Sequence, residues 1–292
     1  MKQNLTAERD ILRPDGDTSC PRTASPEDVY PLSLHRLQIY RVQAFEAFPG
    51  LRHAIFTRHH GFSQSPFHSL NFSVSVGDED QTVQQNFRHA CQSLAVRPEQ
   101  TVSTRLVHGA AVLSVESLSS EHFIGEADSL ITATPDLYLF MRFGDCAPLL
   151  FFDPIRRAVG LAHAGWRGTM QNVAGATVKQ MVTQYGCHPA DIIAVIGPAI
   201  GPCCYEVGQD VIDAVHQTFG SAEGLLSFRS GKGHLAHLDL EAANAQQLTA
   251  AGLQQIIRSG LCTACRRDEF FSHRAEKGRT GRFGVLIGVD RT

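Results

Sequence analysis

The chain of 292 residues has no surplus of positive charge and no long apolar run. With 26 Lys and Arg against 29 Asp and Glu, its formal net charge is −3, so it lacks the basic field that dominates binding to nucleic acids and anionic membranes. No stretch approaches 18 uninterrupted apolar residues, and residues 1–28 contain no apolar segment typical of a signal peptide. The sequence therefore predicts a cytoplasmic protein whose partners are neither nucleic acids nor membranes.

Several well-defined motifs are also missing. Neither G-x-G-x-x-G nor the Walker A pattern occurs, so dinucleotide and P-loop chemistry have no support. The HxH and HCH clusters of blue multicopper oxidases are absent as well, which disfavours copper oxidation. Residues 37–292 show no internal repeat and no Pro/Gly-rich linker. We therefore expect one domain at residues 34–292, after a disordered leader at residues 1–33 that is rich in polar residues and lacks apolar periodicity.

Apolar runs typical of strands alternate with segments of helical periodicity. The expected strands are residues 53–58, 137–143, 148–153, 158–163 and 192–197. The expected helices are residues 82–96, 168–186, 208–220 and 239–253, and Gly186 is placed to end the second of them. This alternation predicts the α/β class, or an α+β sandwich, in which a single domain contains mixed β-sheets flanked by helices.

Three apolar runs each end at a residue that can bind a metal or act as a nucleophile. They are TVSTRLVHGAAV with His108, LYLFMRFGDCAP with Cys146 and AVGLAHAGWRG with His163. Ligands of α/β proteins collect at strand ends and in the loops that follow. Two imidazoles and a thiolate suit zinc, and a catalytic zinc leaves a fourth position for water, whose pKa it lowers to about 7. A zinc site at these three residues is therefore geometrically possible, although their spacing in the sequence matches no compact zinc motif.

The same residues permit a second chemistry. Cys146 as thiolate nucleophile, His163 as base and Asp145 or another acid as the residue that orients the base would form a cysteine hydrolase. Ordinary packing is the third interpretation, because cysteine is among the most buried residue types. The residues alone do not separate a metal site from a nucleophile, whereas the metal content of the purified protein does.

Other cysteines and histidines form weaker patterns. Cys262-x-x-Cys265 is half of a structural zinc motif without a second pair at suitable spacing. The adjacent Cys203 and Cys204 are expected in a turn between a strand and a helix. His234 and His237, spaced as H-x-x-H, are expected in a solvated loop.

Four arginines lie in or beside the expected strand ends, namely Arg58, Arg105, Arg142 and Arg167. A guanidinium binds phosphate through two parallel hydrogen bonds. Arg167 also precedes an expected helix start at Gly168, where free backbone N–H groups favour anions. These residues suggest a small phosphate site, and ordinary ion pairing is the alternative.

Seven motifs occur in one consistent order: VHG (107–109), EADSLIT (126–132), DCAP (145–148), HAGWRG (163–168), GPAIGPCCYEVG (197–208), DLEAANAQQL (239–248) and TGRFGVLI (280–287). Through them the chain resembles the YfiH-like, laccase-domain family over residues 40–289. That family was first labelled a multicopper polyphenol oxidase and later understood as a purine nucleoside phosphorylase family. The resemblance implies a single α/β domain with a fold similar to that of toxin deamidases and related cysteine hydrolases.

The resemblance also implies ligands, substrates and activities. It assigns zinc to His108, Cys146 and His163, which would also be the catalytic residues, with copper as an alternative occupant. The implied substrates are phosphate and the purine nucleosides adenosine, inosine, guanosine and methylthioadenosine, and the implied side activity is adenosine deamination. Asn71 and Asp145, which lie in matching motifs, join Arg58 and Arg167 as candidates for binding substrate or phosphate.

Three alternatives to the phosphorylase stay open. The first is a cysteine hydrolase or amidase that uses Cys146 and His163. The second is a copper-binding polyphenol oxidase, and the third is a non-enzymatic protein that binds a metal or a partner. The sequence predicts no oligomeric state.

The chain departs from the family pattern at four places. His60 stands where glycine is usual, and Leu106 stands where glutamine is common before the VHG motif. Phe143 and Gly144 replace Thr-Ala before Asp-Cys, and His273 interrupts an FSYR-like segment. We expect these changes to affect the wall of the nucleoside pocket rather than the metal ligands. His60 is expected in that wall, and an added metal ligand or a residue that only faces solvent are the alternatives.

Overall fold

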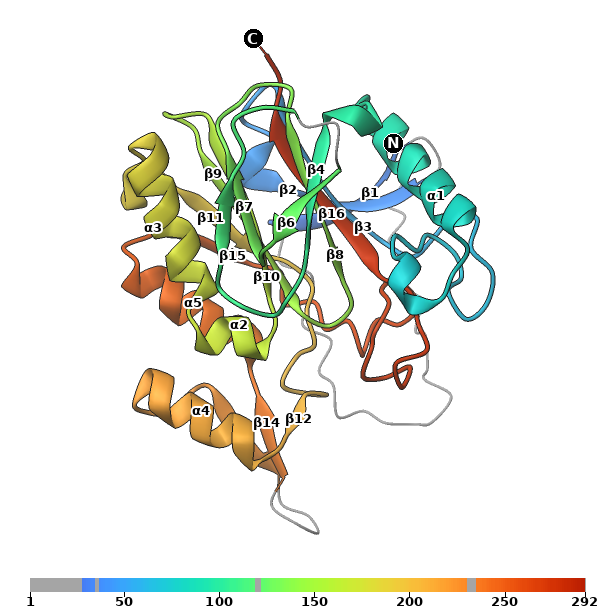
Figure 1. The fold of residues 1–292 in the computed structure, drawn as a ribbon. Coiled ribbons are helices and arrows are strands. Elements are labelled where there is room, and N and C mark those ends of the chain that lie inside the picture. The colour runs from blue at the N-terminus through green and yellow to red at the C-terminus, as the bar shows by residue number, and fades with distance from the viewer. Residues whose placement is uncertain (1–27, 35–36, 119–121, 230–234, 292) are drawn as a thin grey trace, which may run out of the picture.

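Two β-sheets packed face to face form the centre of the protein (Figure 1). The computed structural model describes residues 28–34, 37–118, 122–229 and 235–291. The first sheet has the order β1 (Val29–Leu34), β2 (Leu37–Val42), β3 (Leu51–Phe56), β16 (Phe283–Val289), β8 (Tyr138–Phe143), β4 (Thr101–Arg105) and β6 (Phe123–Glu126). The second has the order β15 (Gln255–Arg258), β11 (Ile193–Ile196), β9 (Ala147–Asp153), β10 (Ala158–Ala164), β7 (Ser129–Thr132) and β5 (Val112–Ser114).

Both large sheets are mixed. In the first, β16 runs antiparallel to β3 and β8, whereas β4 runs parallel to β8. In the second, β9 and β10 are antiparallel, whereas β11 and β15 are parallel. A small third sheet has the order β12 (Glu206–Val207), β14 (Leu235–Leu238) and β13 (Leu226–Arg229). The predicted single domain of mixed sheets flanked by helices is confirmed.

Helices surround the sheets, and most of them lie on the outer faces of the two large ones (Figure 1). They are α1 (Asp80–Ser93), α2 (Trp166–Met170), α3 (Val173–Tyr185), α4 (Gln209–Phe219) and α5 (Leu240–Ala250), with short 3₁₀ turns at η1 (Gln43–Phe45), η2 (Val74–Val76), η3 (Pro98–Gln100) and η4 (Pro189–Asp191). Helix α1 lies on the first sheet, and α3 and α5 lie on the second. Helix α4 lies beside the small third sheet. None of the described helices is long and apolar enough to span a membrane.

The alternation of side chains along each strand creates these layers. In β9, Leu150 and Phe152 point into the core between the sheets, whereas Leu149 and Phe151 pack beneath the helices. Successive side chains of a strand point to opposite faces. A strand that is covered on both faces must therefore be apolar throughout. The uninterrupted apolar runs in the sequence are explained by this double burial.

The helix expected at residues 168–186 is wrong in one respect, because it is two helices. Helix α2 ends at Met170, and α3 begins at Val173. Between them Asn172 adopts φ 61°, in the left-handed region, and its side chain accepts a hydrogen bond from the Gly175 N–H. Asparagine tolerates this conformation and is a favoured N-cap. The predicted end at Gly186 is confirmed by its φ of 65°.

Asn172→Ala is expected to lower the free energy of unfolding by about 1–2 kcal/mol, because it removes the cap and strains a left-handed residue. Asn172→Gly keeps the backbone conformation and should cost only a few tenths of a kcal/mol. Urea denaturation of both variants measures the difference. Equal stabilities would contradict the capping role.

The expected boundary between leader and domain falls too late. Val29–Leu34 forms β1, which pairs antiparallel with β2. Val29 is fully buried in the core between the sheets. Pairing with β2 satisfies the backbone N–H and C=O groups of this strand. The local composition, which is rich in polar residues, does not reveal that pairing. Residues 1–27 of the expected leader lie outside the described residues.

Candidate functional site

Strand pairing brings together the three residues predicted at the strand ends. In the antiparallel pair of β9 and β10, His163 lies opposite Pro148 and Ala164 opposite Ala147. His163 therefore lies beside Cys146, which immediately precedes β9. His108 lies in the loop after β4, and its ring centroid is 5.0 Å from that of His163. One ligand atom from each of the three residues lies within 4.8 Å of the others.

Asp128 fixes the orientation of His163. The carboxylate Oδ1 of Asp128 lies 2.9 Å from Nδ1 of His163. Because an ionised carboxylate only accepts hydrogen bonds, Nδ1 carries the hydrogen and Nε2 is left as the atom that binds a metal or a proton. A histidine that ligates a metal usually donates its other ring N–H to such a partner.

The same carboxylate holds the loop that carries His108. It accepts hydrogen bonds from the backbone N–H groups of Val107 at 3.1 Å, His108 at 3.0 Å and Gly109 at 2.7 Å. These bonds stabilise the left-handed conformation of His108, whose φ is 58°. Asp128 therefore positions two of the three site residues. Sequence analysis found it only as part of EADSLIT and gave it no role.

The site favours a thiolate at Cys146. Burial alone would raise the pKa of this thiol, but the charge of His163 and hydrogen bonds from His108 and His163 lower it to about 6. Burial would lower the pKa of His163, and the neighbouring Cys146 and Asp128 raise it to about 9. A thiolate is both the form that binds metal and the nucleophilic form.

The two glycines of HAGWRG permit close approach at the start of α2. A Cβ on Gly165 would lie 2.9 Å from Sγ of Cys146 and 3.3 Å from the ring of His108. A Cβ on Gly168 would lie 2.8 Å from the carbonyl oxygen of Gly109. Any larger residue at these positions would push the three site residues apart.

The tryptophan and the arginine of this motif lie at the edge of the site. Trp166 is partly buried against the core beneath α3 and α5. The guanidinium of Arg167 lies over its ring, 4.3 Å from the centroid, and the side chain is exposed. No carboxylate of the described residues pairs with Arg167. Arg167 is therefore available to an anion.

Arg58 and Asn71, two of the other predicted binding residues, are engaged in the structure itself. Arg58 pairs with Glu276 at 3.0 Å and donates to the carbonyl oxygens of His68 and Arg267. Asn71 is fully buried, and both ends of its amide are hydrogen-bonded to protein groups. The geometry gives both residues partners within the protein, and their contact with substrate or phosphate stays a prediction.

Asp145 precedes Cys146 but does not orient His163. Its carboxylate accepts hydrogen bonds from Oγ1 of Thr263 at 2.7 Å and from the backbone N–H of Arg274 at 2.6 Å. Burial raises its pKa. Asp145 therefore does not orient the base, and the other acid that the prediction allowed for is Asp128, which holds His163.

Arg105 and Arg142 also have partners within the described chain. Arg105 pairs with Glu126 at 3.5 Å on the surface. Arg142 donates to the carbonyl oxygen of Thr104 and lies over the ring of Phe123.

The residues that depart from the family pattern differ in how far they are buried. Phe143 is fully buried, and its ring lies 5.5 Å from that of His163, so this residue does wall the site. His60 is exposed and adopts φ 65°, a conformation that explains why glycine is usual there. His60 belongs to neither group of closely spaced metal-binding side chains found among the described residues. Leu106 packs against the core between the sheets, and His273 is exposed beside Arg282.

Sequence reasoning missed Tyr205 and Arg282. Burial and the nearby Cys146 raise the pKa of Tyr205 to about 12. Burial lowers the pKa of Arg282, while Cys146 and Asp145 oppose that shift. Both residues therefore lie within electrostatic reach of the thiolate. Both residues lie in motifs noted in the sequence, CCYEVG and TGRFGV. No periodicity in the sequence indicates that these motifs lie close to Cys146.

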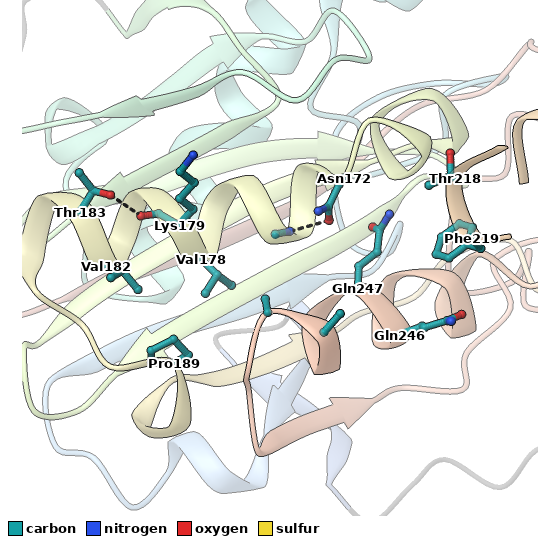
Figure 2. Close-up of a pocket in the computed structure, with 13 residues that line it drawn as sticks. Asn172, Val178, Lys179, Val182, Thr183, Pro189, Thr218, Phe219, Gln246 and Gln247 are labelled. Carbon is teal, nitrogen blue, oxygen red and sulfur yellow. Dashed lines mark hydrogen bonds between the residues drawn. The ribbon is translucent and has the colours of Figure 1, made fainter.

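A separate pocket lies between α3, α4 and α5 (Figure 2). Asn172, the N-cap residue of α3, and Lys179 of α3 line one side, and Gln246 and Gln247 of α5 line the other. The residues around it do not include His108, Cys146 or His163. The pocket therefore does not mark the site of chemistry.

Comparisons with known proteins identify the family of this chain. A family model described as multi-copper polyphenol oxidoreductase laccase matches residues 52–290. The purine nucleoside phosphorylase YlmD of Geobacillus stearothermophilus is 39% identical over 250 residues, which cover 82% of this chain and 91% of that protein. The protein of the same name from Bacillus subtilis is 36% identical, over 80% of this chain and 86% of its own length.

Solved structures show the same fold. The crystal structure of YlmD from Geobacillus stearothermophilus superposes with a TM-score of 0.80 at 38% identity and covers 87% of this chain and 96% of its own. The crystal structure of the hypothetical protein YfiH from Bacillus licheniformis also gives a TM-score of 0.80, at 34% identity, covering 86% and 96% of the two chains.

Proposed function

We propose that this chain, which belongs to the multi-copper polyphenol oxidoreductase laccase family, is a zinc-dependent purine nucleoside phosphorylase. Relatives at 36–39% identity carry the phosphorylase name. The proposed substrates are phosphate with adenosine, inosine, guanosine or methylthioadenosine, and the proposed side activity is deamination of adenosine. The observation that carries the proposal is the convergence of His108, Cys146 and His163, with Asp128 bound to His163.

The donor set fits zinc. Two imidazoles and one thiolate form a ligand set of catalytic zinc sites, which leave one position open. Asp128 leaves Nε2 of His163 as the binding atom, and the neighbouring imidazoles favour the thiolate form of Cys146. His108 is exposed, so the open side of the site faces solvent. When bound, zinc would supply a Lewis acid that activates water and orients an anion.

Phosphorolysis breaks the bond between C1′ of the ribose and N9 of the purine, and forms a bond from C1′ to a phosphate oxygen. The protein must hold the anion near C1′ and stabilise the departing base. Arg167 offers an exposed guanidinium without a carboxylate partner among the described residues. Tyr205 stays protonated at neutral pH, because its pKa is about 12, and so offers a hydrogen-bond donor near Cys146.

Arg167→Ala is expected to raise the KM for phosphate about tenfold, which corresponds to about 1.4 kcal/mol of lost binding, a typical value for a hydrogen bond to a charged group. The KM for the nucleoside should change little. Initial rates at varied phosphate concentration provide the measurement. Arg105→Ala, which removes an exposed guanidinium in a surface ion pair, is the matched control, and equal phosphate KM values in both variants would refute the role of Arg167.

Deamination requires water but no phosphate, because C6 of adenosine exchanges its amino group for oxygen and releases ammonia. We expect adenosine incubated with the zinc-loaded protein to give inosine in the absence of phosphate. Adding phosphate should give free purine base in addition. Chromatography of the two mixtures separates the activities, and free base released equally without phosphate would indicate hydrolysis instead.

A cysteine hydrolase is the second candidate, and the pair formed by Cys146 and His163 favours it. A thiolate beside an imidazolium that is held by Asp128 is the arrangement of a nucleophile, a base and an orienting acid. Zinc bound to Cys146 would protect this thiolate from iodoacetamide. Rapid alkylation of Cys146 in protein that keeps its full zinc content would favour the hydrolase over the phosphorylase.

A further inference from the structure

Four other cysteines meet in a second cluster. Cys203 and Cys204 lie in the loop between β11 and β12, and Cys262 and Cys265 lie in the loop after β15. The sulfur of Cys265 lies 3.3 Å from that of Cys203 and 3.4 Å from that of Cys204, and the four sulfurs lie within 4.8 Å of one another. The sequence offers no second pair at suitable spacing for Cys262-x-x-Cys265, but the fold brings the adjacent Cys203 and Cys204 to it.

The sheet topology explains this meeting. Strands β11 and β15 are parallel neighbours, so the loops that leave their C-terminal ends lie side by side. Beyond the strands the pairing continues as a parallel bridge between Ala199 and Cys262. Ala199 donates its N–H to the carbonyl oxygen of Leu261, and Thr263 donates its N–H to the carbonyl oxygen of Ala199. The backbone therefore holds both cysteine pairs at one place before any ion binds.

The spacing of the sulfurs suits a single tetrahedral ion. A zinc–sulfur bond of about 2.3 Å separates the sulfurs of a tetrahedral site by about 3.8 Å. The observed separations of 3.3 Å, 3.4 Å and at most 4.8 Å bracket that value. In a four-iron cluster each thiolate binds a different iron, and in a two-iron cluster two thiolates bind each iron. Sulfurs bound to different irons lie farther apart than sulfurs that share one ion.

The surroundings also favour thiolates. The backbone N–H of Gly201 donates to Sγ of Cys262 at 3.2 Å. A loop that directs N–H groups at sulfur stabilises a charge that a neutral thiol does not carry.

We propose that Cys203, Cys204, Cys262 and Cys265, as thiolates, bind a structural Zn²⁺ distinct from the site at His108, Cys146 and His163. Cys265 is disulfide-bonded in this structure, so the binding form follows reduction of that bond. A thiol or phosphine reductant supplies two electrons, and two protons from solvent complete the two thiols. On binding zinc, the four cysteines release their remaining protons to solvent.

This zinc would join two segments that form hydrogen bonds to Asp145, the residue before Cys146. The backbone N–H of Ile200 donates to the carbonyl oxygen of Asp145 at 2.9 Å, and Oγ1 of Thr263 donates to its carboxylate at 2.7 Å. Ile200 belongs to the loop of the first cysteine pair, and Thr263 lies between the two cysteines of the second. The ion therefore acts as a cross-link behind the reaction site, without contact to substrate.

Metal counting on the full chain tests the proposal. Protein reduced with a phosphine, supplied with zinc and desalted should hold two zinc ions per chain by native mass spectrometry and elemental analysis. The Cys203→Ser/Cys265→Ser variant should hold one, and Cys146→Ser should also hold one. The Cys91→Ser/Cys187→Ser control, which removes two buried thiols outside the cluster, should keep two.

The outcomes separate this proposal from the proposed function. A wild-type protein with one zinc that survives in Cys146→Ser and disappears in Cys203→Ser/Cys265→Ser supports the structural site and contradicts the metal in the reaction site. Zinc content that is equal in wild type and Cys203→Ser/Cys265→Ser overturns the structural site. Iron with acid-labile sulfide in place of zinc overturns it too.

A second measurement tests the proposal if the Cys203→Ser/Cys265→Ser variant does not fold. Cys146→Ser leaves the four-cysteine cluster as the proposed site, so the reduced variant loaded with Co²⁺ should show the strong visible absorption of a tetrahedral tetrathiolate together with sulfur-to-cobalt charge transfer. A folded Cys146→Ser protein without these bands would overturn the proposal.

Discussion

Cys146→Ser is expected to lose the metal of the reaction site and to lower the rate of phosphorolysis by more than about 100-fold. Loss of a partner that only orients a ligand typically costs 10–100-fold in metal affinity or activity, and loss of a ligand should cost more. The serine hydroxyl stays protonated at neutral pH, whereas the histidines lower the pKa of the Cys146 thiol to about 6. Metal content and initial rates with inosine and phosphate provide the measurement.

Cys91→Ser is the matched control for this variant. Cys91 is also buried, but burial raises its pKa to about 12, so its thiol is neutral and inert. Its replacement should affect stability and leave the metal and kcat unchanged. Full phosphorolysis in a Cys146→Ser protein that holds no metal at His108 and His163 would refute the zinc role.

Asp128→Asn is the second substitution with a large expected effect. We expect a loss of 10–100-fold in zinc affinity and activity, as for other partners that orient a metal-binding histidine. We also expect a loss of about 1–3 kcal/mol in the free energy of unfolding, because an amide cannot accept hydrogen bonds from three backbone N–H groups and from His163. Zinc titration with a competing chelator and urea denaturation measure the two effects.

Asp153→Asn separates the two effects of that substitution. Asp153 is another fully buried carboxylate, and it accepts hydrogen bonds from the backbone N–H groups of Ile155 and Arg156. Its replacement should lower stability and leave zinc affinity unchanged. If both variants lost stability and neither lost zinc affinity, Asp128 would be a structural residue only.

Sequence reasoning was most successful for the reactive side chains that lie at the end of a strand or directly after it. The buried runs before His108 and His163 predicted strands, and strand ends cluster at one edge of a sheet. The three residues do come together because β9 and β10 pair in the required register. Their role as zinc ligands stays a prediction, which the resemblance supplied and the donor geometry supports.

The failures have a common physical cause. Asp128 lies in β-rich sequence without a local signal, and its role depends on hydrogen bonds to a loop some twenty residues earlier. The cysteine cluster depends on the parallel pairing of β11 and β15, which no spacing between the cysteines reveals. The break at Asn172 depends on one left-handed residue within an otherwise regular helical pattern. Each feature is set by a tertiary contact or a single backbone conformation rather than by periodicity.

The phosphate-site predictions stay untested, but the structure ranks their residues by how many partners they already have. Arg58 and Asn71 were chosen for their residue type and motif, but protein groups bind both side chains. An arginine near a strand end is as readily an internal ion pair as an anion site. Arg167 is exposed, so we propose it as the phosphate contact ahead of these two residues.

Product analysis of zinc-loaded protein with inosine, in the presence and absence of phosphate, tests the central claim most directly. The account predicts that hypoxanthine and ribose 1-phosphate appear in equal amounts only when phosphate is present, and that removal of zinc by a chelator stops the reaction until zinc is restored. Release of base without phosphate, or an undiminished rate in chelator-treated protein shown to hold no metal, would contradict it.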